Sequence, residues 1–244
     1  MPSSSTMRIS CIRKDLIGKY ATAAAYLYGA ISISEFVDVF NRYESASTSE
    51  EEVRLALTRL AKAKSVEYSL NKNLITCPEL RPGIEEDEKD LASIRESQKG
   101  KPRYLPEKAE FLRYADCTYF EPEKPYARLA AYILKHGLAP ERGGDDESIE
   151  GDMLYLHQMI QFSVDPSYYM EYFYNEDYRF KDESQAENFA RLILSAYSHT
   201  RMYDCNGFTP YEEMGYFGDQ DKIIPFPKKP SNQSGSVKAG RNEP

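Results

Sequence analysis

Apolar positions in the first part of the chain recur at helical spacing, which predicts a run of α-helices. In the segment 31–43, Ser32 and Glu35 have the spacing of a capping box, in which each side chain bonds the backbone N–H of the other residue. The apolar residues that share one face of this expected helix are Phe36, Val37, Phe40 and Tyr43. The pattern therefore predicts an amphipathic helix that starts at Ser32.

The neighbouring segments follow the same design. Thr48 and Glu51 are the expected capping pair of a following helix, which continues to residue 64. Its apolar stripe consists of Val53, Ala56, Leu57 and Leu60. An earlier helix is expected over 15–30, where it would supply the third wall of a small helical core.

Alternation replaces helical spacing after these helices. Val66, Tyr68 and Leu70 alternate with polar residues, and apolar positions resume after the polar turn 71–73, which predicts a short β-hairpin. Three helices followed by a hairpin are the element order of a winged helix. We therefore predict a winged-helix-like domain over residues 1–80.

The next segment differs in composition. Residues 81–102 combine proline, glycine and an acidic cluster, so they are predicted to be a connector, with one exposed helix over 87–98. Residues 103–218 return to helical spacing and are predicted to form a second, α-helical domain. The expected fold class is therefore mainly α.

Within this second domain, apolar stripes predict helices over 124–136, 147–162 and 184–199. Ser184 and Glu187 have the spacing of a capping box for the last of them. A further short helix is expected to start at Pro210, with Thr209 as its N-cap.

The chain after residue 218 is rich first in proline and then in Ser, Asn, Gln and Gly, which predicts a flexible linker over 219–244. It ends in VKAGRNEP, which resembles the lead-in to the SEC-C motif, a zinc-binding module found on the SecA translocation ATPase and on other bacterial proteins. The residues that carry the resemblance are Lys238, Gly240, Arg241, Asn242, Glu243 and Pro244.

In that family the cysteine ligands of the zinc follow the lead-in at once. The resemblance therefore implies that the full-length protein continues into a zinc module, whereas no cofactor or metal is expected in the present chain. It also implies a protein partner in the translation or secretion machinery, because the related tail of SecA engages a chaperone and the ribosome.

The net charge, the cysteines and the hydropathy of the chain bear on its expected partners and location. The chain has 244 residues and a net charge of −8, which disfavours unaided binding to duplex nucleic acid. Its four cysteines are far apart and form no CxxC pair, so we expect reduced thiols in a cytoplasmic protein. The least charged stretch, 20–34, is too short to span a membrane.

A nucleic-acid interface is the alternative that a winged helix invites. Arg54, Thr58 and Lys62 would share one exposed face of the third helix, and Lys72 would lie at the tip of the hairpin. The acidic run 50–52 at the start of the same helix would repel phosphates. A solvated face is therefore the favoured interpretation of these four residues.

Two further groups are candidates for ligand or partner contacts. Arg201 and Asn206 could form a polar pocket that holds an anion, although bonds to the carbonyls of a helix end, with Gly207 as its C-cap, are favoured. Tyr168 and Tyr172 belong to a segment with more rings than one helical face can bury, which indicates a contact surface.

The sequence gives little support for an enzyme. Its three histidines are isolated from one another, and neither a glycine-rich phosphate loop nor a GxSxG motif is present, so no catalytic residue is predicted. We expect a non-catalytic cytoplasmic adaptor that binds a protein partner. The alternative is a regulator that binds nucleic acid through its N-terminal domain.

Overall fold

The computed structural model describes residues 9–117, 119, 121, 123–139 and 146–217. These residues form ten α-helices, one 3₁₀ helix (η1) and three short strands, so the fold is mainly α, as predicted. In chain order the elements are α1 Cys11–Tyr28, β1 Ala30–Ser32, α2 Ile33–Tyr43, α3 Glu50–Ala63, β2 Ser69–Asn71, β3 Leu74–Thr76, α4 Glu85–Gln98, α5 Lys108–Phe111, η1 Leu112–Ala115, α6 Glu123–His136, α7 Asp146–Gln161, α8 Ser167–Asn175, α9 Glu183–His199 and α10 Pro210–Phe217.

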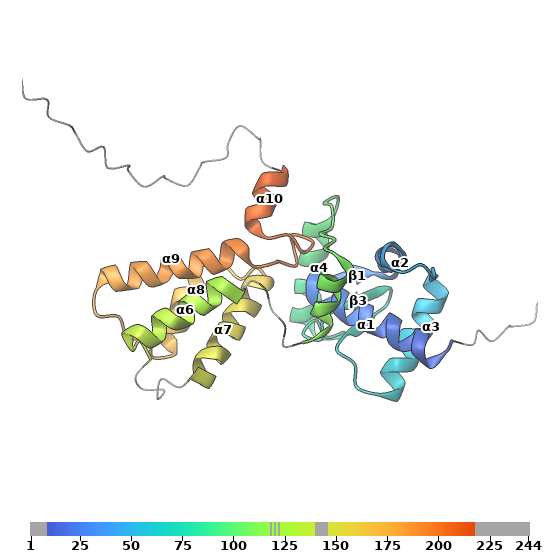
Figure 1. Ribbon diagram of the computed structural model, residues 1–244, viewed down its shortest axis with the longest axis horizontal. Helices are drawn as coiled ribbons and strands as arrows, with labels where there is room; N and C mark the ends of the chain where they lie inside the picture. The colour runs from blue at the N-terminus through green and yellow to red at the C-terminus, as the bar shows by residue number, and fades with distance from the viewer. Residues whose placement is uncertain (1–8, 118, 120, 122, 140–145, 218–244) are drawn as a thin grey trace, which may run out of the picture.

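Figure 1 shows two halves side by side, with α1–α4 and the strands in one and α6–α9 in the other. We call residues 9–117 the N-terminal half and the described residues from 123 onward the C-terminal half. The predicted linker over 219–244 lies outside the described residues.

A small antiparallel sheet holds the N-terminal half together. Its strand order is β1-β3-β2, with Ile31 opposite Ile75 and Leu70 on the other side of Ile75. The expected hairpin is confirmed, and Lys72 occupies its turn with a φ of 55°. The sequence pattern did not predict β1, because its three residues lie between two helices and are too few to show alternation.

Of the four predicted N-caps, two are confirmed and two are wrong. Ser32 forms the capping box of α2 with Glu35, and Thr209 accepts a hydrogen bond of 3.1 Å from the N–H of Glu212 at the start of α10. The N-cap of α3 is Ser49 rather than Thr48, and that of α9 is Asp182 rather than Ser184. In both wrong cases the predicted cap lies within two residues of the true cap, and both residues have side chains that can accept a bond from a backbone N–H of the first turn. The helix expected over 15–30 starts earlier, at Cys11, with Ser10 as its N-cap.

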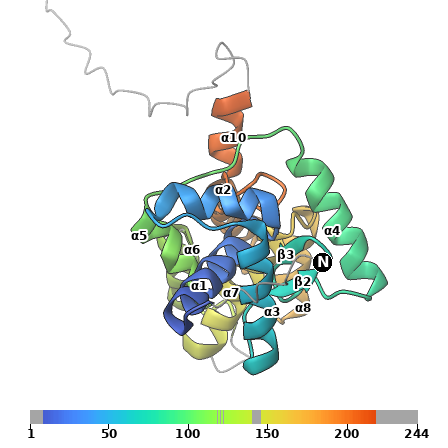
Figure 2. The ribbon, with the colours of Figure 1, turned by 90° about the vertical axis from the view of Figure 1, so that its right-hand side faces the viewer.

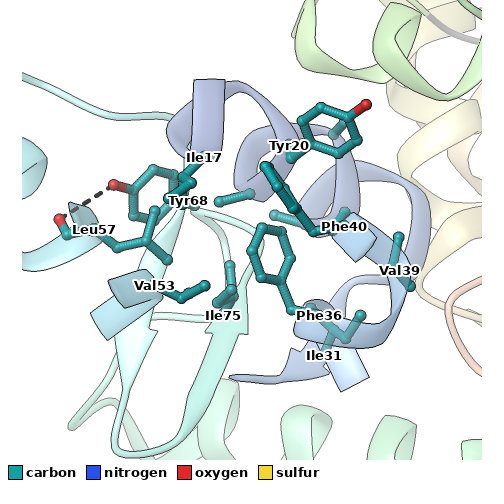
Figure 3. Close-up of a cluster of buried hydrophobic side chains, with 14 of the residues drawn as sticks. Ile17, Tyr20, Ile31, Phe36, Val39, Phe40, Val53, Leu57, Tyr68 and Ile75 are labelled. Atoms are coloured by element: carbon teal, nitrogen blue, oxygen red, sulfur yellow. Dashed lines mark hydrogen bonds between the residues drawn. The ribbon is translucent and has the colours of Figure 1, made fainter. Parts of the chain in front are cut away.

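The core of the N-terminal half surrounds α1. Ile17 and Tyr20 on α1 pack against Phe36 and Phe40 on α2, and the β3 residue Ile75 closes the cluster from the sheet (Figure 3). Phe111 and Tyr114 from α5 and η1 also belong to this core. This first core therefore includes residues that follow 102, the end of the connector that composition predicted.

The expected connector is a structural part of the N-terminal half. Figure 2 shows α4 running along the outside of this half, where it contacts β1. Leu91 and Ile94 on its inner face are buried with Leu80 and Cys77 in a small apolar cluster, which also includes Tyr203 of the C-terminal half. Most of α4 is exposed, as predicted, but its inner face is covered.

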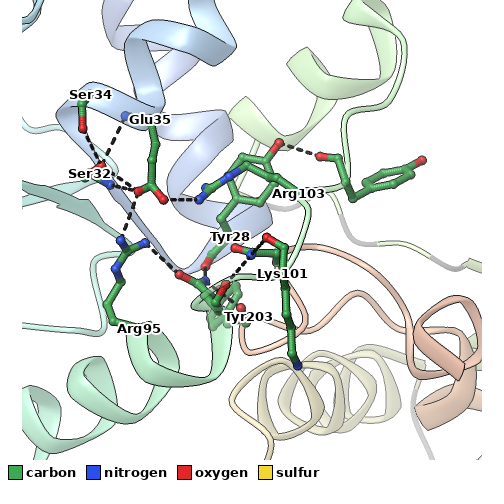
Figure 4. Close-up of polar contacts among 11 residues, drawn as sticks. Tyr28, Ser32, Ser34, Glu35, Arg95, Lys101, Arg103 and Tyr203 are labelled. Atoms are coloured by element: carbon green, nitrogen blue, oxygen red, sulfur yellow. Dashed lines mark hydrogen bonds and ion pairs between the residues drawn. The ribbon is translucent and has the colours of Figure 1, made fainter. Parts of the chain in front are cut away.

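Polar contacts join the seam between the two halves. The Gln98 amide donates hydrogen bonds to the Tyr28 carbonyl at 2.8 Å and to the Tyr203 carbonyl at 2.7 Å. Nearby, Glu35 accepts from Arg95 and Arg103, each at 3.1 Å, and the Arg103 guanidinium lies 4.6 Å from the centre of the Tyr28 ring (Figure 4). The seam is therefore packed and hydrogen-bonded along α4 and the segment that follows it.

The second core lies between α6, α7, α8 and α9. Its largest buried side chains are Tyr126, Tyr169, Phe173, Tyr178 and Phe189. The helices expected over 124–136, 147–162 and 184–199 are confirmed to within one residue at each end. No helix among the described residues is both long and apolar enough to cross a bilayer.

Candidate functional site

Exposed aromatic rings gather on α8. Before this helix, Asp165 Oδ1 accepts a hydrogen bond of 2.9 Å from the Ser167 N–H, which satisfies one of the free donors of the first turn. Tyr169 and Phe173 point into the second core. Tyr168 lies on a different side of α8, and 56% of its surface is exposed.

Tyr172 lies one turn after Tyr168 on the same side of α8. Its hydroxyl donates a hydrogen bond of 2.7 Å to Asp152 Oδ1, and the buried Tyr178 hydroxyl donates one of 2.6 Å to Asp152 Oδ2. The ring of Tyr155 lies 4.7 Å from that of Tyr172 and is 47% exposed. We call Tyr155, Tyr168 and Tyr172 the tyrosine face.

The charges on α7 and α8 have one sign. The segment 146–175 contains six Asp or Glu residues and no Lys or Arg. Glu150, Asp165 and Glu171 in this segment are exposed. Because the negative face of an aromatic ring and a carboxylate both attract cations, the tyrosine face is suited to a positively charged partner.

The four residues of the nucleic-acid hypothesis are all exposed. Arg54, Thr58 and Lys62 lie on α3, and Lys72 lies in the turn between β2 and β3. Arg54 is bonded to the Asn73 side chain, so the structure does bring α3 and the turn together.

Carboxylates surround the start of α3. Arg54 forms an ion pair of 3.4 Å with Glu50, and Glu52 accepts a hydrogen bond of 3.1 Å from Arg13. Glu51 in the same turn is exposed. These charges favour the helix dipole and oppose a phosphate backbone at this end of α3.

Arg201 is buried in the seam, with 7% of its surface exposed. Its guanidinium lies 3.5 Å from the centre of the Tyr104 ring. One of its nitrogens donates to the Gly207 carbonyl at 3.1 Å and to Glu212 Oε2 at 3.0 Å. Burial acts to lower the pKa of Arg201, but the nearby Tyr114 and Glu212 outweigh it and raise that pKa, so the guanidinium stays charged.

Two further carboxylates face the same guanidinium. Glu110 and Glu121 lie 3.9 and 3.7 Å from Arg201, and each also accepts a hydrogen bond of 2.8 Å from a tyrosine hydroxyl, that of Tyr104 and that of Tyr114 respectively. Arg201 thus balances the charge of three carboxylates, those of Glu110, Glu121 and Glu212, inside the seam.

Asn206 and Gly207 have positions that differ from those expected. The cap of α9 is Thr200, so Gly207 is not its C-cap but lies further along the loop, with a φ of 82°. Arg201 bonds this loop and not the end of a helix. Asn206 does bond a helix end, since its amide donates at 3.0 Å to the carbonyl of Gln98, the last residue of α4. Both residues therefore have structural partners.

Burial shifts the pKa of two side chains of chemically reactive types, His157 and Cys205. Burial lowers the pKa of His157 to about 4, which keeps its imidazole neutral. Burial also raises the pKa of the Cys205 thiol, so it is not a thiolate nucleophile.

The zinc that the SEC-C resemblance implies has no ligand set in the described part of the chain, where no three His, Cys, Asp or Glu side chains are placed to hold a metal ion. The residues that carry the resemblance, Lys238, Gly240, Arg241 and Asn242, lie outside that part.

Sequence reasoning selected Tyr168 and Tyr172 but missed Tyr155 and Asp152, which lie on another helix. A usable signal was present, because no Lys or Arg occurs between Arg142 and Arg179. It also missed the role of Tyr104 and Glu110, whose contacts with Arg201 depend on how the halves meet.

Comparisons of this chain with protein-family models, with curated proteins and with solved structures gave no significant match.

Proposed function

We propose that this protein is a non-catalytic adaptor whose tyrosine face binds a basic segment of a protein partner. The observation that carries the proposal is the group of three neighbouring rings, two of them about half exposed, on helices that carry acidic residues and no Lys or Arg. Tyrosine is enriched at protein interfaces because a rigid ring gives a large contact area at a small cost in entropy.

The chemistry of the face selects the partner. An arginine or lysine side chain over Tyr168 or Tyr155 would gain a cation–π contact of about 0.5–1 kcal/mol at an exposed site. Glu171, exposed one turn after Tyr168, would add attraction at longer range. A partner segment with several Lys or Arg residues fits both features.

For the N-terminal half we propose a winged-helix-like domain with a supporting role. The order α1-β1-α2-α3-β2-β3 and the sheet order β1-β3-β2 support this assignment. The acidic first turn of α3 favours a docking or scaffolding use of the domain over DNA binding. The SEC-C resemblance supports the same adaptor role, with zinc bound by the full-length protein and a partner in translation or secretion.

The proposal is tested with labelled peptides and the purified chain. Fluorescence anisotropy should detect binding of an Arg/Lys-rich peptide and no binding of a Glu-rich peptide of equal length. The double variant Tyr155→Ala with Tyr168→Ala should bind the basic peptide about tenfold more weakly. This change corresponds to about 1.4 kcal/mol of binding free energy. Equal binding of both peptides, or an unchanged affinity in the double variant, would contradict the proposal.

A matched control is available on other surfaces of the C-terminal half. Leu134 and Leu194 are 47% and 52% exposed, so they resemble the two tyrosines in exposure but lie on α6 and α9. The double variant Leu134→Ala with Leu194→Ala should bind the basic peptide as the parent chain does.

The alternative function is nucleic-acid binding through α3 and the turn. The contact of Arg54 with Asn73 favours it, because it joins the helix and the turn that would approach a duplex together. This alternative predicts salt-sensitive binding of duplex DNA or RNA by the whole chain, weakened by Lys62→Glu. Absence of binding at low salt would exclude it, whereas such binding, lost in the variant, would replace the adaptor proposal.

A further inference from the structure

A pocket of about 820 Å³ lies where the two halves meet, beside Arg201 and the carboxylates that face it. Its walls come from α5 and η1 of the N-terminal half and from α6 and α9 of the C-terminal half. This volume is within the range of small-molecule sites, which occur preferentially at interfaces between domains. The pocket is separate from the tyrosine face, whose residues are absent from its lining.

Cationic side chains line this pocket from two elements. Arg113 on η1 and both Lys124 and Arg128 on α6 contribute to its wall. Within the described part of the chain, neither Lys124 nor Arg128 forms an ion pair. Lys124 and Arg128 are four residues apart on one helix, so their side chains project from the same side of α6.

Two carboxylates also line the pocket, but the wall behind them offsets their charge. Glu110 and Glu121 are the pocket residues that face the buried Arg201 at 3.9 and 3.7 Å. Each of these carboxylates also accepts a hydrogen bond from a tyrosine hydroxyl, that of Tyr104 or that of Tyr114. Arg201 is itself paired with Glu212, and among the lining residues three cations stand against two carboxylates, so the lining carries a net positive charge in a chain whose net charge is −8.

Apolar and aromatic groups complete the walls. Pro125 and Ala109 line the pocket, as does Tyr119, whose ring lies 4.1 Å from the Arg113 guanidinium. His199 is held by a bond of 2.8 Å between its Nδ1 and the Ser195 carbonyl, and its ring stacks on Tyr211. These groups leave room and apolar contact for the organic part of a ligand beside its charged part.

We infer that this seam pocket binds a phosphorylated small molecule, with Arg113, Lys124 and Arg128 as the residues that hold its phosphate groups. Guanidinium groups form paired hydrogen bonds with phosphate oxygens, and a lysine ammonium adds a compact point charge. Three cations match a group with two or more negative charges. The inference goes beyond adaptor function and does not depend on it.

Isothermal titration calorimetry of the whole chain tests this inference, with pyrophosphate and a nucleoside diphosphate as probes. Both probes should bind, and the nucleoside diphosphate should bind more tightly because it adds an organic group. The double variant Lys124→Glu with Arg128→Glu should lose at least about tenfold in affinity for each probe. No heat of binding at millimolar probe, or equal affinity in the variant, would overturn the inference.

A control on the same helix separates a defined site from general charge. Lys135 is exposed on α6 and does not line the pocket. Lys135→Glu should retain the affinity of the parent chain, and an equal loss in this variant would overturn the assignment to the pocket. Circular dichroism should show the same helical content in all three proteins. The Tyr155→Ala/Tyr168→Ala variant should bind both probes normally, which keeps this test distinct from that of the adaptor proposal.

Discussion

In the N-terminal half, the rings of Tyr20, Tyr28 and Tyr68 are buried, whereas in the C-terminal half Tyr155 and Tyr168 are about half exposed. The buried hydroxyls have defined partners inside the same half, such as the Tyr104 carbonyl, which accepts from Tyr28 at 2.7 Å. The exposed rings lie beside acidic residues and face solvent.

Tyrosines also fill the core of the C-terminal half, so the comparison shows that one residue type serves packing in both cores and surface chemistry at Tyr155 and Tyr168. A tyrosine whose ring is covered by apolar neighbours stabilises the fold through burial, with its hydroxyl satisfied by a local acceptor. A tyrosine that stays half exposed gains little from folding and is available to a partner. Substitutions of buried and of half-exposed rings should therefore separate stability from binding.

The largest expected effect comes from a core ring of the N-terminal half. Phe40 is fully buried between Tyr20 and Phe36, and the Arg13 guanidinium lies 4.8 Å from its ring centre. Phe40→Ala should lower the free energy of unfolding by about 3–5 kcal/mol because it leaves a cavity. Tyr168→Ala should change it by no more than about 0.5 kcal/mol. Urea unfolding followed by circular dichroism measures both, and similar losses would contradict the division between core and surface rings.

An intermediate effect is expected at Asp152, which accepts hydrogen bonds from two tyrosines. Tyr178→Phe removes a hydrogen bond inside the core. It should lower the free energy of unfolding by about 1–3 kcal/mol, because Oδ2 of the buried Asp152 loses this donor. Tyr172→Phe should cost less, since Tyr172 is only half buried and water can replace its hydroxyl. The two unfolding midpoints give the comparison, and the reverse order would show that the tyrosine face is part of the core.

The smallest expected effect is a pH dependence in the N-terminal half. Hydrogen bonds from Arg13 lower the pKa of Glu52 below the usual value for a glutamate. The resulting stabilisation is present above the unfolded-state pKa and is lost as the pH falls through the lowered folded-state pKa. At neutral pH, Glu52→Gln should cost less than about 1 kcal/mol, because the pair is partly solvated.

This difference between Glu52→Gln and the parent chain should shrink on acidification, as measured by thermal unfolding across the acid range. Glu51→Gln, in the same turn of α3 and exposed, is the matched control and should show no comparable loss. A difference that persists in acid would show that packing, and not charge, accounts for the role of Glu52.

The sequence was sufficient for elements whose signal is local. The capping box of Ser32 and Glu35 and the turn at Lys72 depend on neighbouring residues, and both form as predicted. The predicted caps Thr48 and Ser184 lie one and two residues from the actual caps, Ser49 and Asp182, because several adjacent polar side chains can cap a first helical turn.

Long-range contacts could not be predicted in the same way. Nothing in the local pattern places Tyr155 beside Tyr172, or Glu110 and Glu121 around Arg201, because these pairs depend on how helices cross. Composition at residue 102 indicated a boundary, yet Phe111 and Tyr114 pack on α1. The pattern within one segment predicts its secondary structure, but it does not predict which distant segment packs against it.

Phe111 and Tyr114 have a consequence for the order in which the chain folds as it is made. A ribosome releases the protein from its N-terminus, so α1 emerges long before the residues that cover one of its apolar sides. Until α5 and η1 leave the exit tunnel, Tyr20 and Tyr28 lack the Phe111 ring that lies 5.7 and 6.2 Å from theirs in the finished protein. The nascent N-terminal half therefore exposes a temporary apolar surface, which is the kind of surface that chaperones bind.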